Sequence, residues 1–374
     1  MNENVEKILQ EEDSIKRNDF FNQLDPSHFS LMTFVDTLIP SLVWENNLRH
    51  GNFHLIKMSL FLRNLARRQL FGEQTERALA QLIMRHIDKL TWTRIVVETQ
   101  PHMAEPIDEP VERMLSEMAK GNAHNAFFYA LTARQTDKYA LFDALMQNGA
   151  VSIADTLGHS ISCFFPVLTD VLAVDHPDSG TCLLSLIMYL CRYHNSRASI
   201  VEGTPLTNAD KSRLMSKAAS GRTIVDLHHM ITFYTLQAWE AVDWHTTFTP
   251  PWQRLADWMG EKHVDASRES RADRVLGKRT GCVPATYEDL QRLFLDKNHD
   301  AILDAAMALL AESYEKTCDW LFRIYAEFYT PDWNPHYVTS LYAALELYRD
   351  KTISTQASMM AFIQALEYFL ESNE

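Results

Sequence analysis

Histidine and aspartate side chains stand at the head of one apolar stretch of the chain, residues 226–239. The segment reads DLHHMITFYTLQAW, and its apolar residues recur every three or four positions, which predicts a buried helix. Asp226, His228 and His229 open it, and titratable groups in such a place need partners because burying them alone costs free energy. An imidazole beside a carboxylate can act as a general acid or base near neutral pH. We therefore expect chemistry at this helix.

Two further acid–histidine pairs occur at helical spacing. Asp155 precedes His159 by four residues, and Asp296 precedes His299 by three. Residues three or four apart share one face of a helix, so each pair can bring a carboxylate to an imidazole. Such pairs form half of the carboxylate di-metal sites of helical bundles, but those sites also need glutamates inside apolar helices, and this chain offers none in a comparable run. The alternative interpretation is that these histidines are core residues that donate a hydrogen bond to the acid.

The spacing of two other histidines raises the possibility of a metal site. His50 and His54 are four residues apart, and on one helix this spacing can bring two imidazoles to the same ion. The chain has no His/Cys zinc spacing, no HExxH, no GxSxG and no glycine-rich phosphate loop. We expect a site without a metal, and His50 and His54 are the alternative ligands.

Composition and charge limit the classes of partner. The 374 residues carry a formal net charge of −14, which disfavours nucleic acids and anionic membranes as partners because Lys and Arg hold phosphate. The five cysteines form no CxxC pair, which favours a reducing compartment. The acidic N-terminal segment resembles no secretory signal, and no apolar run is long enough to cross a bilayer. We expect a cytoplasmic protein that acts on a small molecule.

The elements that must position these residues are helices. Only 11 Gly and 13 Pro punctuate the chain, and helical periodicity recurs along its length, which predicts a single all-α domain over residues 1–374 with roughly 13–16 helices and no significant sheet. Residues 1–20 are a polar lead-in. Residues 262–285 lack apolar periodicity and predict a flexible polar connection. We also expect one helix to end at Pro40 and another to run unbroken over residues 301–329.

Three short motifs follow one another over about residues 140–320, and each joins a histidine to an apolar helix. They are Leu141-Phe142-Asp143 with Gly149 and Leu157-Gly158-His159; His228 or His229 with Ile231-Thr232 and Leu236; and Asp296-Lys297-Asn298-His299 with Ile302 and Leu303. In this order they resemble motifs of the questin oxidase-like family, an all-helical family associated with oxidative ring opening of anthraquinones.

The resemblance implies an oxidoreductase that acts on a flat polycyclic aromatic ligand, with NADPH as the candidate cofactor. Histidines would then supply acid–base chemistry in a helical pocket, aspartates would orient them, and a tyrosine would donate to a quinone or phenolate oxygen. The expected catalytic residues are His159, His228, His229, His299, Asp226, Asp296 and Tyr234. Two alternatives stay open, a non-catalytic helical scaffold that binds a partner and a metal-dependent helical oxygenase.

Overall fold

The computed structural model describes residues 29–50, 53–87, 107–193, 205–242, 244, 249–278, 283–328 and 334–372. Within these ranges the chain forms helices and no strand, so the predicted all-α class is confirmed. The predicted polar lead-in, residues 1–20, lies outside the described residues. None of the helices in the described ranges is both long enough and apolar enough to cross a membrane.

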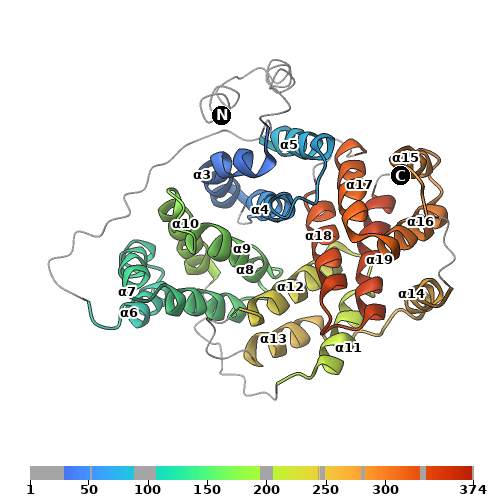
Figure 1. Ribbon diagram of the computed structural model, residues 1–374. Helices are drawn as coiled ribbons and strands as arrows, with labels where there is room; N and C mark the ends of the chain where they lie inside the picture. Colours follow the sequence, from blue (N-terminus) through green and yellow to red (C-terminus); the bar gives the residue numbers. More distant parts are fainter. Residues whose placement is uncertain are drawn as a thin grey trace.

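The first half of the chain forms one end of the molecule and part of its centre (Figure 1). Its helices are α3 (Leu31–His50), α4 (His54–Arg67), α5 (Glu73–Ile87), α6 (Pro110–Ala119), α7 (Ala123–Val151), α8 (His159–Ser162), α9 (Phe164–Val167), the π-helical turn η2 (Leu168–Leu172) and α10 (Ser179–Tyr193).

The second half continues through the centre to the opposite end. Its helices are α11 (Asn208–Ala218), α12 (Ile224–Glu240), α13 (Thr249–Met259), α14 (Ala266–Lys278), α15 (Tyr287–Leu295), α16 (His299–Glu312), α17 (Tyr314–Glu327), α18 (His336–Arg349) and α19 (Thr355–Glu371).

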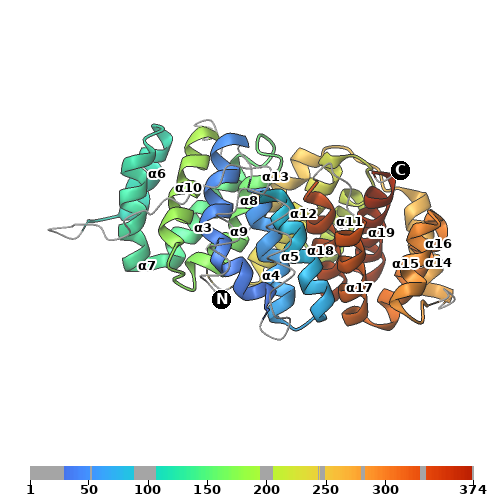
Figure 2. The ribbon, with the colours of Figure 1, turned by 90° about the horizontal axis from the view of Figure 1, so that it is seen from above.

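The helices form an elongated array, with α6 and α7 at one end and α14, α15 and α16 at the other (Figure 2). In both views α4, α8, α12 and α18 lie between these ends. α12 packs against α8 and α18, and α18 packs against α4 as well. Segments far apart in the sequence therefore meet at the middle of the protein.

The helix predicted over residues 226–239 is present as α12, and its first turn explains where it begins. Thr223 precedes the helix with extended backbone, and its hydroxyl accepts a hydrogen bond from the Asp226 amide while the Asp226 carboxylate accepts from the Thr223 amide. This capping box satisfies two amides that have no partner within the helix. Apolar residues then bury most of the helix surface, including Met230, Ile231 and Leu236.

Three expectations about local structure are wrong. α3 continues through Pro40, because Leu38 and Leu42 on either side of it are buried and hold the helix in the core although proline removes one backbone hydrogen bond. The helix predicted over residues 301–329 is divided at Ser313, whose backbone is extended and whose hydroxyl caps α17.

The polar connection predicted over residues 262–285 contains α14. Arg268 on this helix is only 2% exposed. Its guanidinium donates to Glu367 on α19 and to the carbonyls of Ala219 and Gly221. Most of the segment is polar because it is not buried, and α14 is held to the protein partly by this buried ion pair. Apolar periodicity could not reveal such a helix.

Candidate metal centre

Four histidines from four helices converge at the centre of the molecule. They are His54 on α4, His159 on α8, His228 on α12 and His336 on α18. One ring nitrogen from each lies within 4.8 Å of the corresponding nitrogens of the other three. The rings stand edge to face, with centroids 4.4 Å apart for His54 and His336 and 4.5 Å apart for His159 and His228. We call this group the four-histidine cluster.

The cluster is enclosed on three sides. His159, His228 and His336 are between 2% and 6% exposed, whereas His54 keeps partial exposure. Most of the cluster is therefore shielded from solvent within the described part of the chain.

A backbone carbonyl fixes the orientation of His159. The Nδ1 atom of His159 lies 2.6 Å from the carbonyl oxygen of Thr156. A carbonyl only accepts, so Nδ1 carries the proton and donates it. In the neutral ring the Nε2 atom then presents a lone pair, and it points at His54 Nε2 at 2.5 Å. Ligating histidines in metalloproteins are held in the same way by a hydrogen bond at the other ring nitrogen.

His336 is oriented by a side chain at the start of its own helix. Its Nδ1 donates to the Asn334 Oδ1 atom at 2.7 Å, and its backbone amide donates to the same oxygen at 3.1 Å. The Nε2 atom of His336 is buried and has no hydrogen-bond partner among the described residues. A buried lone pair without a donor is costly, and an ion in the cluster would satisfy it.

His228 reaches the cluster from the second turn of α12. Its Nδ1 atom is likewise buried without a hydrogen-bond partner in the described ranges. Its ring lies 4.5 Å from that of His159 and 4.5 Å from that of His336, measured between centroids. His228 therefore links the other members of the cluster and adds a second orphaned nitrogen to it.

Burial keeps all four imidazoles neutral. Burial, and after it the charge of Lys57, lowers the pKa of His159 to about 3. Burial also places the pKa values of His54, His228 and His336 well below the usual range, and neighbouring histidines and Lys57 add to the effect. Neutral imidazole is the form that binds metals.

The cluster fits one transition-metal ion. Imidazole is a ligand for zinc, copper, iron and nickel. With metal–nitrogen bonds of about 2.1 Å, two nitrogens on opposite sides of an ion lie about 4.2 Å apart. Nitrogens within 4.8 Å of one another are near this limit, and the Nε2 atoms of His54 and His159, 2.5 Å apart, would have to separate to about 3.0–3.4 Å to bind the same ion.

Two glycines allow α8 to approach its neighbours closely enough to present His159. Gly158 has a positive φ of 74°, and a Cβ there would lie 2.0 Å from the Thr232 hydroxyl on α12. A Cβ on Gly149 would lie 2.5 Å from the Ser160 carbonyl. Any larger side chain at either position would push α8 away, so these glycines position His159 against α12.

His229 lies beside the cluster and belongs to a separate polar group. Its Nδ1 atom lies 2.8 Å from Lys262 Nζ, which also donates to Asp226. Its ring packs edge-on against Trp258, with centroids 4.2 Å apart. Burial, followed by the charge of Lys262, lowers the pKa of His229 to about 4. The predicted Asp226–His229 pair is present, with carboxylate and ring nitrogen 3.8 Å apart, but it also engages Lys262.

The other predicted site residues lie away from the cluster. Asp296 is exposed at the end of α15, and His299 begins α16, which both views place at the far end of the molecule (Figures 1 and 2). Asp155 is exposed, and the Thr156 carbonyl takes its expected place beside His159. The structure thus brings His159 and His228 together and leaves out the pair formed by Asp296 and His299.

Tyr234 lies further along α12 than the cluster. Its hydroxyl donates to the hydroxyl of Tyr342 on α18 at 3.4 Å, and both tyrosines pack around Phe61. Six residues along a helix span about 9 Å, so Tyr234 lies well below His228. Burial raises the pKa of Tyr234, which keeps the phenol protonated.

The alternative metal pair, His50 and His54, does not share one helix. α3 ends at His50 and α4 begins at His54, so the four-residue spacing does not place them on one face. The side chain of His50 lies outside the described residues. His54 is a member of the cluster, but its partners come from α8, α12 and α18.

His336 is the cluster member that sequence reasoning did not identify. It directly follows Pro335 at the first position of its helix, where nothing in the sequence marks it as a core residue, yet it is 4% exposed at the start of α18. A signal was present, because His228 precedes Tyr234 by six residues and His336 precedes Tyr342 by six. The structure pairs both histidines and both tyrosines across α12 and α18.

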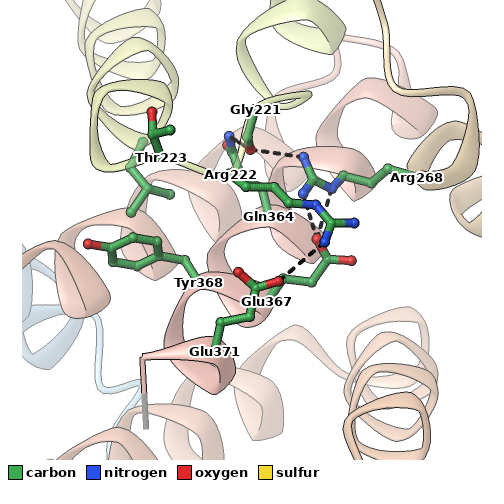
Figure 3. Close-up of a pocket in the computed structure, with 9 residues that line it drawn as sticks. Gly221, Arg222, Thr223, Arg268, Gln364, Glu367, Tyr368 and Glu371 are labelled. Carbon is green, nitrogen blue, oxygen red and sulfur yellow. Dashed lines mark hydrogen bonds and ion pairs between the residues drawn. The ribbon is translucent and has the colours of Figure 1, made fainter. Parts of the chain in front are cut away.

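A shallow, open pocket elsewhere lies between the α11–α12 turn, α14 and α19 (Figure 3). Its side chains bond mainly to each other and to the turn. Arg268 donates to Glu367 at 2.5 Å and to the Gly221 carbonyl at 3.2 Å, and Gln364 donates to the same carbonyl at 2.9 Å. These contacts join three helices, and we assign the pocket a structural role.

A comparison with protein-family models, with curated proteins and with solved structures gives no match in any of the three. The fold and the site therefore define the class of this protein. It is an all-helical protein with a candidate metal centre made of His54, His159, His228 and His336.

Proposed function

We propose that this protein is a metal-dependent oxidoreductase that holds one redox-active transition-metal ion in the four-histidine cluster. The observation that carries the proposal is the convergence of four neutral imidazoles, three of them on buried residues, from four separate helices within 4.8 Å. Two of them leave a buried ring nitrogen without a partner in the described ranges, and an ion would satisfy both.

A chemical role is favoured over a structural one. Structural zinc sites commonly use cysteine and stabilise small domains that lack a core. Here the centre lies within an extensive hydrophobic core that needs no metal to fold. Four imidazoles around a six-coordinate ion such as iron(II) leave two positions for dioxygen and substrate, and that coordination suits oxidative chemistry.

The substrate and the reductant remain those that the family resemblance implies, a flat polycyclic aromatic compound and NADPH. The acid–base role predicted for His159 and His228 is replaced by ligation, since a ligating imidazole has committed its lone pair.

Iron loading followed by oxygen uptake tests this function. The full chain is loaded anaerobically with iron(II), exposed to dioxygen with a hydroxyanthraquinone and NADPH, and followed by oxygen consumption and product mass. We expect one iron per chain and oxygen uptake that depends on the aromatic compound, with at least a hundredfold loss in His228→Ala. Iron binding without oxygen chemistry would reject the oxidoreductase. A chain that binds no metal and has no turnover would favour the scaffold alternative.

A further inference from the structure

Lys57 is a fully buried lysine beside the cluster. It lies on α4 three residues after His54, and Ser162 lies on α8 three residues after His159. Lys57 Nζ donates to Ser162 Oγ at 3.4 Å, just as His54 meets His159 at 2.5 Å. Residues three apart share a helix face and are about 4.5 Å apart along the axis. The lysine contact therefore lies about one turn below the histidine contact, between the same two helices.

The surroundings of Lys57 supply no negative charge. The side chain is 0% exposed, and its polar neighbours in the described ranges are Ser162 and Cys163. Burial raises the pKa of the Cys163 thiol, so this neighbour is neutral. A buried ammonium without a carboxylate is unfavourable, and burial accordingly lowers the pKa of Lys57, so a nearby anion would favour its charged form.

The cluster supplies no negative charge either. The charged neighbours that influence His159 and His336 are Lys57 and other histidines, with no carboxylate among the described residues. Adding a divalent cation to four neutral imidazoles would place it close to the lysine, and two cations in a buried site repel each other. An anion between them would neutralise both and would bond to each.

We infer that the centre binds an anionic oxygen ligand, a carboxylate or a phenolate, between the metal ion and Lys57 Nζ. This inference rests on the proposed metal centre and names the class of ligand that it takes. One oxygen of the ligand bonds to the ion and the lysine donates a hydrogen bond to it. Ser162 accepts another hydrogen bond from the same amine. In this arrangement Lys57 determines specificity, because its amine favours ligands that carry an anionic oxygen.

The test uses the full chain loaded with cobalt(II), whose visible absorption reports its ligands. Acetate and 4-nitrophenolate are titrated separately, so that the two kinds of anionic oxygen are distinguished. We expect at least one of them to change the spectrum with saturation. Lys57→Met should weaken that binding at least tenfold, and Lys57→Arg, which keeps the charge, should retain more of it.

Lys211→Met is the matched control. Lys211 is also buried, but it pairs with Glu240 and packs over Trp252, away from the cluster. Its replacement should leave anion affinity unchanged. A spectrum that responds to neither anion, or equal affinity in wild type and Lys57→Met, would overturn the inference while leaving the metal centre intact. A chain that binds no cobalt would overturn the metal centre and the inference together.

Discussion

The Nε2 atoms of His54 and His159 lie 2.5 Å apart, although the residues are 105 positions apart in the sequence. His159 donates a hydrogen bond from its Nδ1–H to the Thr156 carbonyl, so its Nε2 atom presents a lone pair to His54. Such an approach is favourable only with a proton or a metal ion between the two nitrogens. In the metal-free protein a neutral His54 can donate its Nε2 proton to His159, and in the function proposed above a metal ion takes that place.

The metal-free protein should lose stability on acidification. An unfolded histidine has a pKa of about 6.5, and burial lowers the pKa of all four cluster members below that value. Below pH 6.5 the histidines of the unfolded chain become protonated while those of the folded chain stay neutral. Acid therefore favours the unfolded state. Each such histidine contributes about 1.4 kcal/mol per pH unit. Urea unfolding between pH 7 and pH 5 should show this loss.

Replacing one cluster member should flatten the pH profile of the metal-free protein. In His228→Gln the free energy of unfolding should fall less steeply with acid, by about 1.4 kcal/mol per pH unit. His299→Gln is the control, because His299 lies outside the cluster and should leave the slope unchanged. If the free energy of unfolding of the metal-free wild-type protein stays constant between pH 7 and pH 5, the cluster histidines are not buried in the neutral form.

Gly158→Ala should destabilise the protein and disturb the cluster. The new Cβ would meet the Thr232 hydroxyl at 2.0 Å, in a backbone conformation that also disfavours side chains. We expect a loss of about 3 kcal/mol from overpacking and φ strain together. Gly121→Ala is the control, since Gly121 has a similar φ of 73° and nothing within 4 Å of the new Cβ. It should cost about 1 kcal/mol in urea unfolding.

Thr232→Ala in the Gly158→Ala background should recover part of the lost stability. The hydroxyl is the nearest atom to the added methyl group, and the Thr232 Cβ is further away at 3.2 Å. No recovery would mean that α8 is not held against α12 at this point.

Much of the fold could be predicted because helical periodicity and caps are local properties of the sequence. The residues of the site were harder to predict than the fold, because they come together only in the folded chain. His159 and His228 stand out by their apolar neighbours, whereas His336 follows a proline at the start of its helix and carries no sign of burial. Asp296 and His299 show the opposite error, since their spacing suggests one helix but falls between α15 and α16. Spacing identifies a shared face only where the helix is continuous.

Asp226→Ala should cost stability and leave metal binding intact. The carboxylate closes the capping box with Thr223 and accepts from Lys262. We expect a loss of about 2 kcal/mol, the upper range for a lost cap. Asp210→Ala removes the same capping box from α11, where it is exposed, and should cost about 1 kcal/mol. If Asp226→Ala abolishes metal binding while the protein keeps its normal stability, Asp226 belongs to the metal centre, and its separation from the four-histidine cluster is wrong.

Arg268→Met should show that α14 is part of the packed structure. Removing the Arg268 guanidinium leaves Glu367 and two backbone carbonyls without their hydrogen-bond donor. Breaking a buried ion pair lowers the free energy of unfolding by about 3–5 kcal/mol. Arg271→Met is the control on the same helix, because its partner Asp300 is exposed and such pairs contribute less than about 1 kcal/mol. Equal unfolding midpoints for the two variants would support a loosely attached segment.

Metal stoichiometry tests the central claim most directly. The full chain and its variants are loaded with iron(II), copper(II) or zinc(II), freed of excess ion, and measured by elemental analysis. We predict one ion per wild-type chain and per His299→Ala chain. His54→Ala, His159→Ala, His228→Ala and His336→Ala should each retain less than about a tenth of that, since losing a ligand costs most of the affinity. A wild-type chain that retains none of the three metals, or four cluster variants that retain as much as wild type, would contradict the four-histidine centre.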